Sequence, residues 1–321
     1  MPWHISPSGR FSLSTPSPSS SAIVLLGGGR GLARVLHALR GVDCDPTVIV
    51  SIAYNERAGN DVLRGANGPT VEDLRRSLEA LAGDELALMR AIRRPLAVER
   101  LGRYPLGNFV IASLARAFGD HAAASRWLGE QLGISGMVLP ATTEPVPVEI
   151  ELVDDELTMG GPGGGSAGRL RHVRFATKHL EAPAEAVAAI KRARWALLAP
   201  GPLYRSVLSA SAVPDLTSAL RSTHARIVWI ANLEPDPHDT AGLAGSDHLR
   251  ALRRHGVRVD AALYDPEATL RLEPAVLARY GVAPIPRALR SSSDHAVHDP
   301  DRLRSALREL FSSLPTSTLG R

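Results

Sequence analysis

Four glycines between residues 27 and 31 are the clearest candidates for phosphate chemistry. The stretch LLGGGRGLARV places Gly27, Gly28, Gly29 and Gly31 between an apolar run and a segment with helical spacing. Glycine lets backbone N–H groups approach a phosphate at a helix N-terminus. Leu32 stands where the G-x-G-x-x-G motif needs its third glycine, and the G-K-[ST] of a P-loop is missing. The loop therefore indicates either phosphate contact or a tight strand–helix turn that needs no ligand.

Two further groups of polar residues follow apolar runs. Asn55 and Arg57 come directly after TVIVSIA, and the triplet of Tyr204, Arg205 and Ser206 follows the Gly-Pro turn of WALLAPGPL. An arginine beside a hydroxyl at the start of a helix suits a phosphate oxygen. Arg57 could neutralise a phosphate in the same way. Both segments are candidates for the wall of an anion-binding site.

Three other polar residues have a structural interpretation as well as a ligand-binding one. Asp73 follows Thr70 at the spacing of a helix-capping box, although its carboxylate could also face a metal. Asn108 opens a predicted helix, where an asparagine commonly acts as the N-cap. Asn232 ends a predicted strand before a proline-rich loop, which is typical of an Asx turn. The residues alone leave both interpretations open.

The elements that must position these residues alternate between buried strands and amphipathic helices. Helical stripes include Leu32, Val35, Leu36 and Leu39. This alternation predicts an α/β fold with a doubly wound, mostly parallel, Rossmann-like sheet, whose ligands bind beyond the carboxyl ends of the strands. Predicted strands occupy residues 22–26, 47–53, 136–142, 195–200, 225–231 and 259–264.

The chain divides into a single domain with short polar ends. Residues 1–21, rich in serine and proline, are interpreted as a flexible leader, and residues 313–321 as a polar tail. Residues 22–312 form the predicted domain. Within it, the short alternating segments of about residues 145–175 predict a small β-rich insertion, with a glycine-rich loop at Gly160–Gly165 that either closes over a ligand or forms a hairpin tip.

Composition excludes several classes of function. The chain has 321 residues, of which 44% are hydrophobic, and no apolar run approaches the roughly 20 residues that span a bilayer. A net charge of +4 fits anionic ligands, but no basic run interleaved with aromatic residues points to nucleic acid. The single cysteine, Cys44, fits a reducing compartment. We therefore expect a cytoplasmic protein that binds neither nucleic acid nor a membrane.

Read in order, several of these segments resemble the YvcK/CofD family of gluconeogenesis factors and 2-phospho-L-lactate transferases. The family's GGGTGL appears as Gly27–Leu32, its GHSLGN as Arg103–Asn108 and its GPGSLYTS as Ala199–Ser206. A strand-ending Asn232, an acidic proline-rich loop and a DHLRAL helix complete the resemblance. The GPGSLYTS and DHLRAL motifs are closer to the gluconeogenesis-factor branch. The resemblance runs from about Ala22 to Asp265.

One segment departs from the family pattern. Where the family has ADDGGSSGRLR, this chain has AYNERAGNDVLR, so Tyr54 and Asn55 replace two aspartates. The family's PPGDIR survives as TVEDLR, which keeps Asp73 and Arg75. The resemblance implies a divalent cation at these positions, here reduced to Asp73 and Asn55, and an asparagine supplies no charge to offset the dehydration of Mg²⁺. We expect a nucleotide site with weakened or lost metal dependence.

The resemblance implies one of two functions. The first is a regulatory protein of carbon or cell-envelope metabolism that binds a nucleotide or a UDP-sugar. The second is a transferase that moves a phospholactate-type group from a nucleotide-activated donor to an acceptor. The apolar segment GNFVIASLARAF could serve a homodimer interface or pack within the monomer. The ligand-binding residues implied are Gly27, Gly28, Gly29, Gly31, Asn55, Arg57, Asp73, Arg75, Asn108, Gly201, Tyr204, Arg205, Ser206 and Asn232.

Overall fold

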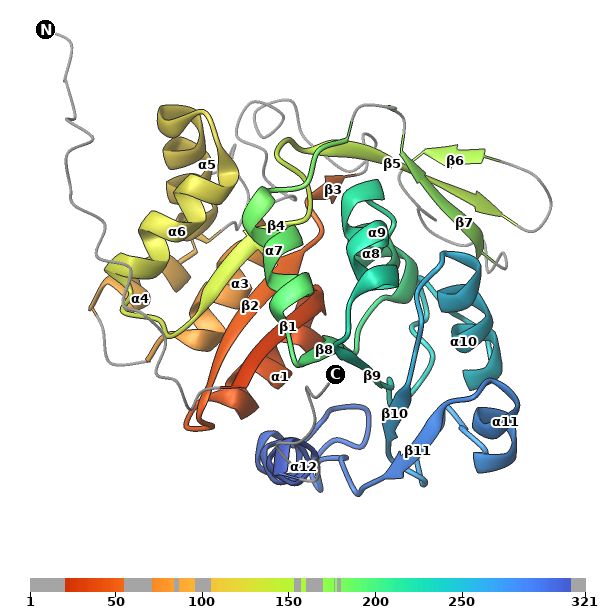
Figure 1. Cartoon of the computed structure of the whole chain (residues 1–321). Coiled ribbons are helices and arrows are strands. Elements are labelled where there is room, and N and C mark those ends of the chain that lie inside the picture. Colours follow the sequence, from red (N-terminus) through yellow and green to blue (C-terminus); the bar gives the residue numbers. More distant parts are fainter. Residues whose placement is uncertain are drawn as a thin grey trace, which may run out of the picture.

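A seven-stranded parallel sheet forms the centre of the protein (Figure 1). The structure is a computed structural model that describes residues 21–54, 71–83, 87–95, 105–152, 157–159, 170–175, 177 and 180–312. The strands lie in the order β11-β10-β9-β8-β1-β2-β4, and all neighbours are parallel. Their bounds are β1 (Ser21–Gly27), β2 (Cys44–Val50), β4 (Met137–Pro140), β8 (Trp195–Leu198), β9 (Arg226–Ile230), β10 (Ala261–Tyr264) and β11 (Ala283–Pro286).

The central strands are continuous apolar runs because both faces of the sheet are covered. In β1, Ile23 and Leu25 belong to one buried hydrophobic cluster, while Val24 and Leu26 belong to the other. Side chains of a strand point to opposite faces in turn, so a strand that is buried on both faces has no polar alternation. The prediction of a doubly wound, mostly parallel sheet is confirmed.

Helices cover both faces of the sheet and contribute to these two clusters. The cluster that contains Ile23 includes residues of α1 (Gly29–Leu39), α3 (Glu72–Leu81), α4 (Ala87–Arg93), α5 (Leu106–Phe118) and α12 (Pro300–Ser312). The cluster that contains Val24 includes residues of α7 (Ala184–Arg192), η2 (Leu203–Leu208), α8 (Ser209–Ser211), α9 (Pro214–Ser222), α10 (Gly245–Arg254) and α11 (Pro274–Arg279). Helix α6 (His121–Gln131) contributes to both.

A second, smaller sheet interrupts the alternation of strands and helices. It consists of β3 (Ala53–Tyr54), β5 (Val146–Leu152), β6 (Leu157–Met159) and β7 (Leu170–Phe175). Strand β5 pairs with β6 and β7 in antiparallel fashion and with β3 in parallel. The predicted β-rich insertion is therefore confirmed as a small sheet. The glycine-rich loop at Gly160–Gly165, most of the predicted leader and the polar tail lie outside the described residues.

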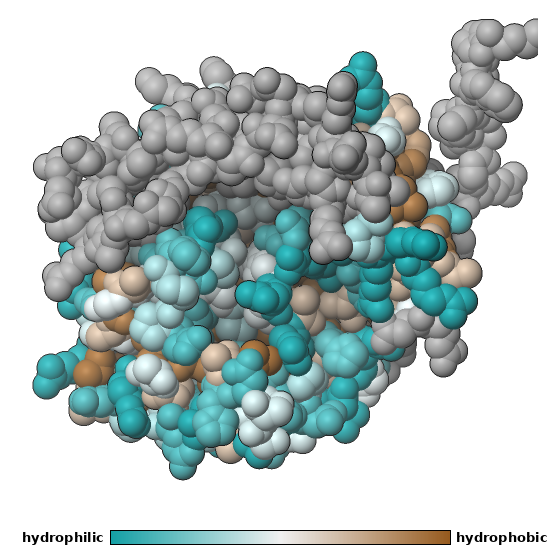
Figure 2. Space-filling model, turned by 180° about the vertical axis from the view of Figure 1, so that it is seen from behind, coloured by the Kyte–Doolittle hydropathy of each residue, from teal (hydrophilic) through white to brown (hydrophobic). Residues whose placement is uncertain are grey.

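The described surface combines hydrophilic residues with a few exposed hydrophobic ones. Figure 2 shows hydrophilic residues over most of the described part of one face, with hydrophobic ones scattered among them. In the described ranges, three large hydrophobic side chains are exposed: Leu88 on α4, Phe118 on α5 and Trp127 on α6. On α5, Ile111 is fully buried, so that helix packs partly within the monomer. Within the described ranges, no helix combines the length and the apolar character that a membrane span requires.

The order of the strands defines one position where ligands commonly bind. From β1 the chain moves outward through β2 to β4, then returns to the other side of β1 and moves outward again from β8 to β11. The direction therefore reverses between β1 and β8. In open α/β sheets, the carboxyl ends of the two strands at such a switch point diverge into a crevice that binds ligands. The turns that follow β1 and β8 are the glycine-containing segments Gly27–Gly31 and Ala199–Ser206.

Candidate functional site

A cavity of about 400 Å³ opens at this switch point. It lies between the turn after β1, the first turn of α3 and the start of η2. Six of its lining residues were predicted from the sequence, and five others were not. The predicted ones are Gly29, Gly31, Asp73, Gly201, Arg205 and Ser206, and the others are Arg30, Glu72, Arg76, Pro202 and Asp236.

The glycines after β1 allow the surrounding groups to approach the backbone. A Cβ on Gly31 would lie 2.1 Å from the carbonyl oxygen of Pro200, in the turn after β8. A Cβ on Gly28 would lie 2.2 Å from Oδ2 of Asp73. Gly29 has φ +69°, a left-handed conformation that favours glycine. The turn therefore needs glycine for contact with its neighbours in the fold, and three chain segments converge on it.

Asp73 packs directly against the glycine turn. Its Oδ1 accepts a hydrogen bond from the N–H of Gly29 at 2.9 Å. Helix α3 begins at Glu72, and its N-cap residue Val71 has no side-chain cap, while Thr70 of the suggested capping box lies outside the described residues. Burial raises the pKa of Asp73, and the Gly29 N–H opposes that shift. The carboxyl group is therefore directed to the site.

The turn after β8 is held by the side chain of Asn232. Its Oδ1 accepts a hydrogen bond from the N–H of Gly201, and its Nδ2 donates to the carbonyl oxygen of Gly201, both at 2.8 Å. Gly201 has φ +141°. The side chain of Asn232 thus holds the turn after β8 through both of its amide atoms. The interpretation of Asn232 as the start of an Asx turn is therefore wrong.

The start of η2 is organised by two aspartates that the sequence reasoning missed. The carboxylate of Asp239 is fully buried and accepts from the backbone N–H groups of Tyr204 and Arg205 at 2.9 and 3.3 Å. The guanidinium of Arg205 donates from Nε to Asp239 at 3.2 Å and lies 3.5 Å from Asp236. Burial raises the pKa of Tyr204 to about 12, with Asp239 adding to the shift. The only sequence signal was the acidic loop PDPHD after strand β9.

Ser206 is buried on the inner wall of the cavity. Its Oγ would lie 3.1 Å from a Cβ placed on Gly28, so the hydroxyl packs against the glycine turn. The segment that carries it, Leu203–Leu208, is a π-helical turn. Such turns recur at functional sites because they redirect side chains within a helix. Gly27, Gly28, Gly29, Gly31, Asp73, Gly201, Arg205 and Ser206 therefore gather around one crevice.

Arg75 and Asn108 lie together, but away from the cavity lining. Both side chains are buried, and Nε of Arg75 donates to Oδ1 of Asn108 at 2.8 Å. Arg75 also forms an ion pair with Glu79. Helix α5 begins at Leu106 with Pro105 as its N-cap, so the interpretation of Asn108 as a cap is wrong. This pair ties α3 to α5 and supports the helix that carries Asp73.

The residues described provide a sparse set of metal ligands. No group of three or more His, Cys, Asp or Glu side chains that could hold a metal ion is found among them. Of the lining carboxylates, Glu72 pairs with Arg76 and Asp236 with Arg205, which leaves Asp73. The predicted partners Asn55 and Arg57 lie outside the described residues. One carboxylate fits Mg²⁺ only if the ligand's phosphates and water supply the remaining oxygens.

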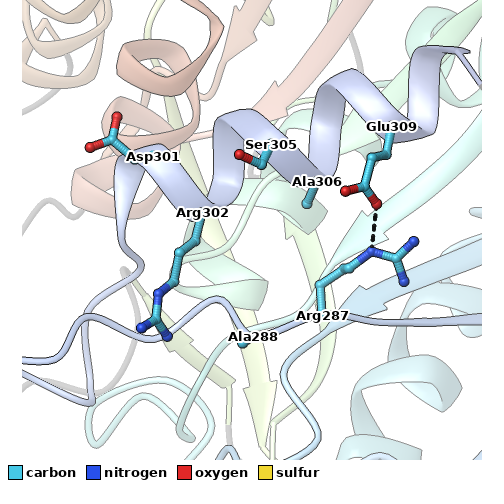
Figure 3. Close-up of a pocket in the computed structure, with 7 residues that line it drawn as sticks. All are labelled: Arg287, Ala288, Asp301, Arg302, Ser305, Ala306 and Glu309. Carbon is cyan, nitrogen blue, oxygen red and sulfur yellow. Dashed lines mark hydrogen bonds and ion pairs between the residues drawn. The ribbon is translucent and has the colours of Figure 1, made fainter.

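A second cavity, of about 300 Å³, lies at α12 near the edge of the sheet (Figure 3). Figure 3 shows Arg287, which follows β11, donating to Glu309 on α12, with an Nε–Oε2 distance of 2.9 Å. Arg302 also lines it, from the first turns of the helix. None of the predicted site residues lies here. Its exposed arginines provide controls for those of the first cavity.

The fold and the crevice at its switch point define a Rossmann-like α/β protein. The sequence profile of the family described as 2-phospho-L-lactate transferase CofD matches residues 23–309. The chain therefore belongs to the CofD family.

Several similar relatives fall on the gluconeogenesis-factor side of this family. A protein from Mycobacterium tuberculosis with a provisional name as gluconeogenesis factor is 32% identical over 77% of each chain. Another from Deinococcus radiodurans, also provisionally so named, is 29% identical over 91% of this chain, which spans 66% of that relative's length. The gluconeogenesis factor of Bacillus subtilis is 27% identical over 73% of this chain and 74% of its own.

A solved structure supports the same assignment. The crystal structure of a UPF0052 family protein from Bacillus halodurans superimposes with a TM-score of 0.83 at 25% identity. The match covers 91% of this chain and all of that one. The resemblance stated from the motifs is confirmed at the level of family and fold.

Proposed function

We propose that this protein binds a nucleotide or nucleotide-sugar, of the UDP-sugar type, and acts as a regulator of carbon or cell-envelope metabolism. The observation that carries the proposal is the cavity between the turns after β1 and β8. Backbone glycines, the Ser206 hydroxyl and the Arg205 guanidinium converge there at the switch point of the sheet. Phosphate groups bind where backbone N–H groups and arginines meet at a helix N-terminus.

Two arginines that line the cavity support a ligand that carries a diphosphate. Arg30 on α1 and Arg205 on η2 both line the cavity, and both residues are exposed. Both stand where the quoted family motifs GGGTGL and GPGSLYTS have threonine. Two guanidinium groups can donate hydrogen bonds to the oxygens of a diphosphate without a bridging metal, which supports a site with reduced metal dependence.

A thermal-shift and calorimetric panel tests this proposal. UDP-glucose, UDP, GDP, GTP and NAD⁺ would each be titrated with Mg²⁺ and with EDTA. We expect UDP-glucose to raise the melting temperature in both conditions, and Arg205→Ala to weaken its binding by about tenfold, the value of one charge-assisted hydrogen bond. Arg302→Ala at the second cavity is the matched control and should bind as the wild type does. A response to NAD⁺ alone, or equal losses in the two variants, would refute the proposal.

A second candidate function is supported by the position of Asp73. A carboxylate against the glycine turn could hold a cation on the phosphates of a nucleotide-activated donor, as a phospholactate-type transferase requires. This function predicts selective stabilisation by GDP with a deazaflavin acceptor, strict dependence on Mg²⁺, and transfer of the phosphate-linked group. Binding of UDP-glucose in EDTA without any transfer would decide for the regulator.

A further inference from the structure

The loop that follows β9 presents two aspartates of different character to the same arginine. Asp239 has a side chain with 0% exposure and bonds to two backbone N–H groups of η2 as well as to Nε of Arg205. Asp236 lines the cavity, has a side chain with 24% exposure, and its Oδ1 lies 3.5 Å from Nη2 of Arg205. One carboxylate is thus part of the interior, and the other is part of the binding surface.

These two contacts have opposite consequences for an anion in the cavity. An arginine side chain is flexible, and a guanidinium that is held in place loses less entropy when it binds an anion. Asp239 provides that restraint from a position that the ligand does not reach. Asp236 instead competes with the ligand for Arg205, and its own charge repels a phosphate. Its Oδ1 also accepts from the N–H of His238 at 2.8 Å, a bond that does not need the charge.

We propose that Asp239 is a positioning residue that holds Arg205 toward an anionic ligand, and that Asp236 is the partner from which the ligand displaces Arg205. The inference rests on the proposed function and concerns the regulation of affinity at that same site. It predicts that neutralising two aspartates three positions apart changes anion affinity in opposite directions. If Asp239 acted only as a cap of η2, its neutralisation would lower stability without these opposite changes in anion affinity.

Isothermal titration with pyrophosphate and with UDP, in EDTA, tests the proposal on Asp236→Asn, Asp239→Asn, Arg205→Ala and the double variant Asp239→Asn/Arg205→Ala. We expect Asp236→Asn to bind both probes roughly two- to fivefold more tightly, as expected from removing one exposed ion pair. Asp239→Asn should bind at least tenfold more weakly, because Arg205 loses its buried charged partner and one amide oxygen cannot replace two carboxylate oxygens that accept from three N–H groups. In the Arg205→Ala background, Asp239→Asn should have no further effect on affinity.

The outcomes separate this inference from the proposed function. If the wild type binds neither UDP, UDP-glucose nor pyrophosphate, the proposed function fails and the inference fails with it. If the wild type binds but Asp239→Asn binds equally well, or remains weaker in the Arg205→Ala background, only the inference is overturned. Circular dichroism shows whether Asp239→Asn folds. If it does not, Asp239→Glu, which keeps the charge but moves the guanidinium, decides by the same double-variant comparison.

Discussion

Replacing Gly28 by alanine tests whether Asp73 and the glycine turn form one packed unit. The backbone of Gly28 has φ −174° and ψ −178°, an extended conformation that alanine adopts without strain. The new methyl group would instead lie 2.2 Å from Oδ2 of Asp73. Displacing that carboxylate breaks its bond to the N–H of Gly29, and overpacking of this kind costs about 1–3 kcal/mol. We expect Gly28→Ala to lower the free energy of unfolding in urea by that amount and to weaken UDP binding.

Two further variants show whether the cost arises at Asp73. In an Asp73→Ala background the clash is gone and the nearest remaining contact is Oγ of Ser206 at 3.1 Å, so Gly28→Ala should cost less than about 0.5 kcal/mol. Gly31→Ala is the control, because its methyl group would meet the backbone carbonyl of Pro200, which Asp73→Ala does not relieve. If Gly28→Ala costs the same in both backgrounds, Asp73 does not face the turn as described.

Two other predictions concern Asn232, which holds the turn after β8, and His298, which is buried outside the cavity lining. Asn232→Asp places a carboxylate oxygen against the carbonyl oxygen of Gly201, where the wild type has an N–H donor. We expect this variant to lower the free energy of unfolding in urea at pH 7 by about 1–3 kcal/mol. Asn232→Gln should not restore the wild-type value. Burial lowers the pKa of His298 to about 4, from about 6.5 in the unfolded chain. Between those values the unfolded state binds more protons, so stability falls as the pH is lowered through this window, by up to about 3 kcal/mol. His298→Gln should flatten the change in the free energy of unfolding between pH 7 and pH 4.5, and an unaltered slope would contradict the assignment.

Much of the fold could be predicted because its signals are local. The runs AIVLL and TVIVSIA are apolar throughout most of their length, which indicates strands buried on both faces, and the helices between them carry clear apolar stripes. From this alternation the parallel sheet follows. The order of the strands does not follow, because the pairing of β1 with β8 joins segments about 170 residues apart.

The site could be predicted only where the residue type itself carries the information. A glycine cluster between a strand and a helix is typical of a close backbone approach, so Gly27 to Gly31 were found. Asn232 lies beside the crevice and Asn108 does not, and both make other contacts than a cap or a turn, since a short polar side chain suits a cap, a turn or a clamp equally well. Asp239 was missed because its partners are 34 and 35 residues away and no spacing rule links them.

The balance of charge in the cavity explains why composition could not reveal its ligand. Three arginines and three carboxylates line it, so its formal net charge is zero. Ion pairs join Arg76 to Glu72 and Arg205 to Asp236, and the described residues provide no such pair for Arg30 or Asp73. Attraction for an anion thus depends on which pairs open when it binds, and not on an excess of positive charge. The buried carboxylate of Asp239 matters for this reason, since it keeps Arg205 at the cavity when its exposed partner is displaced.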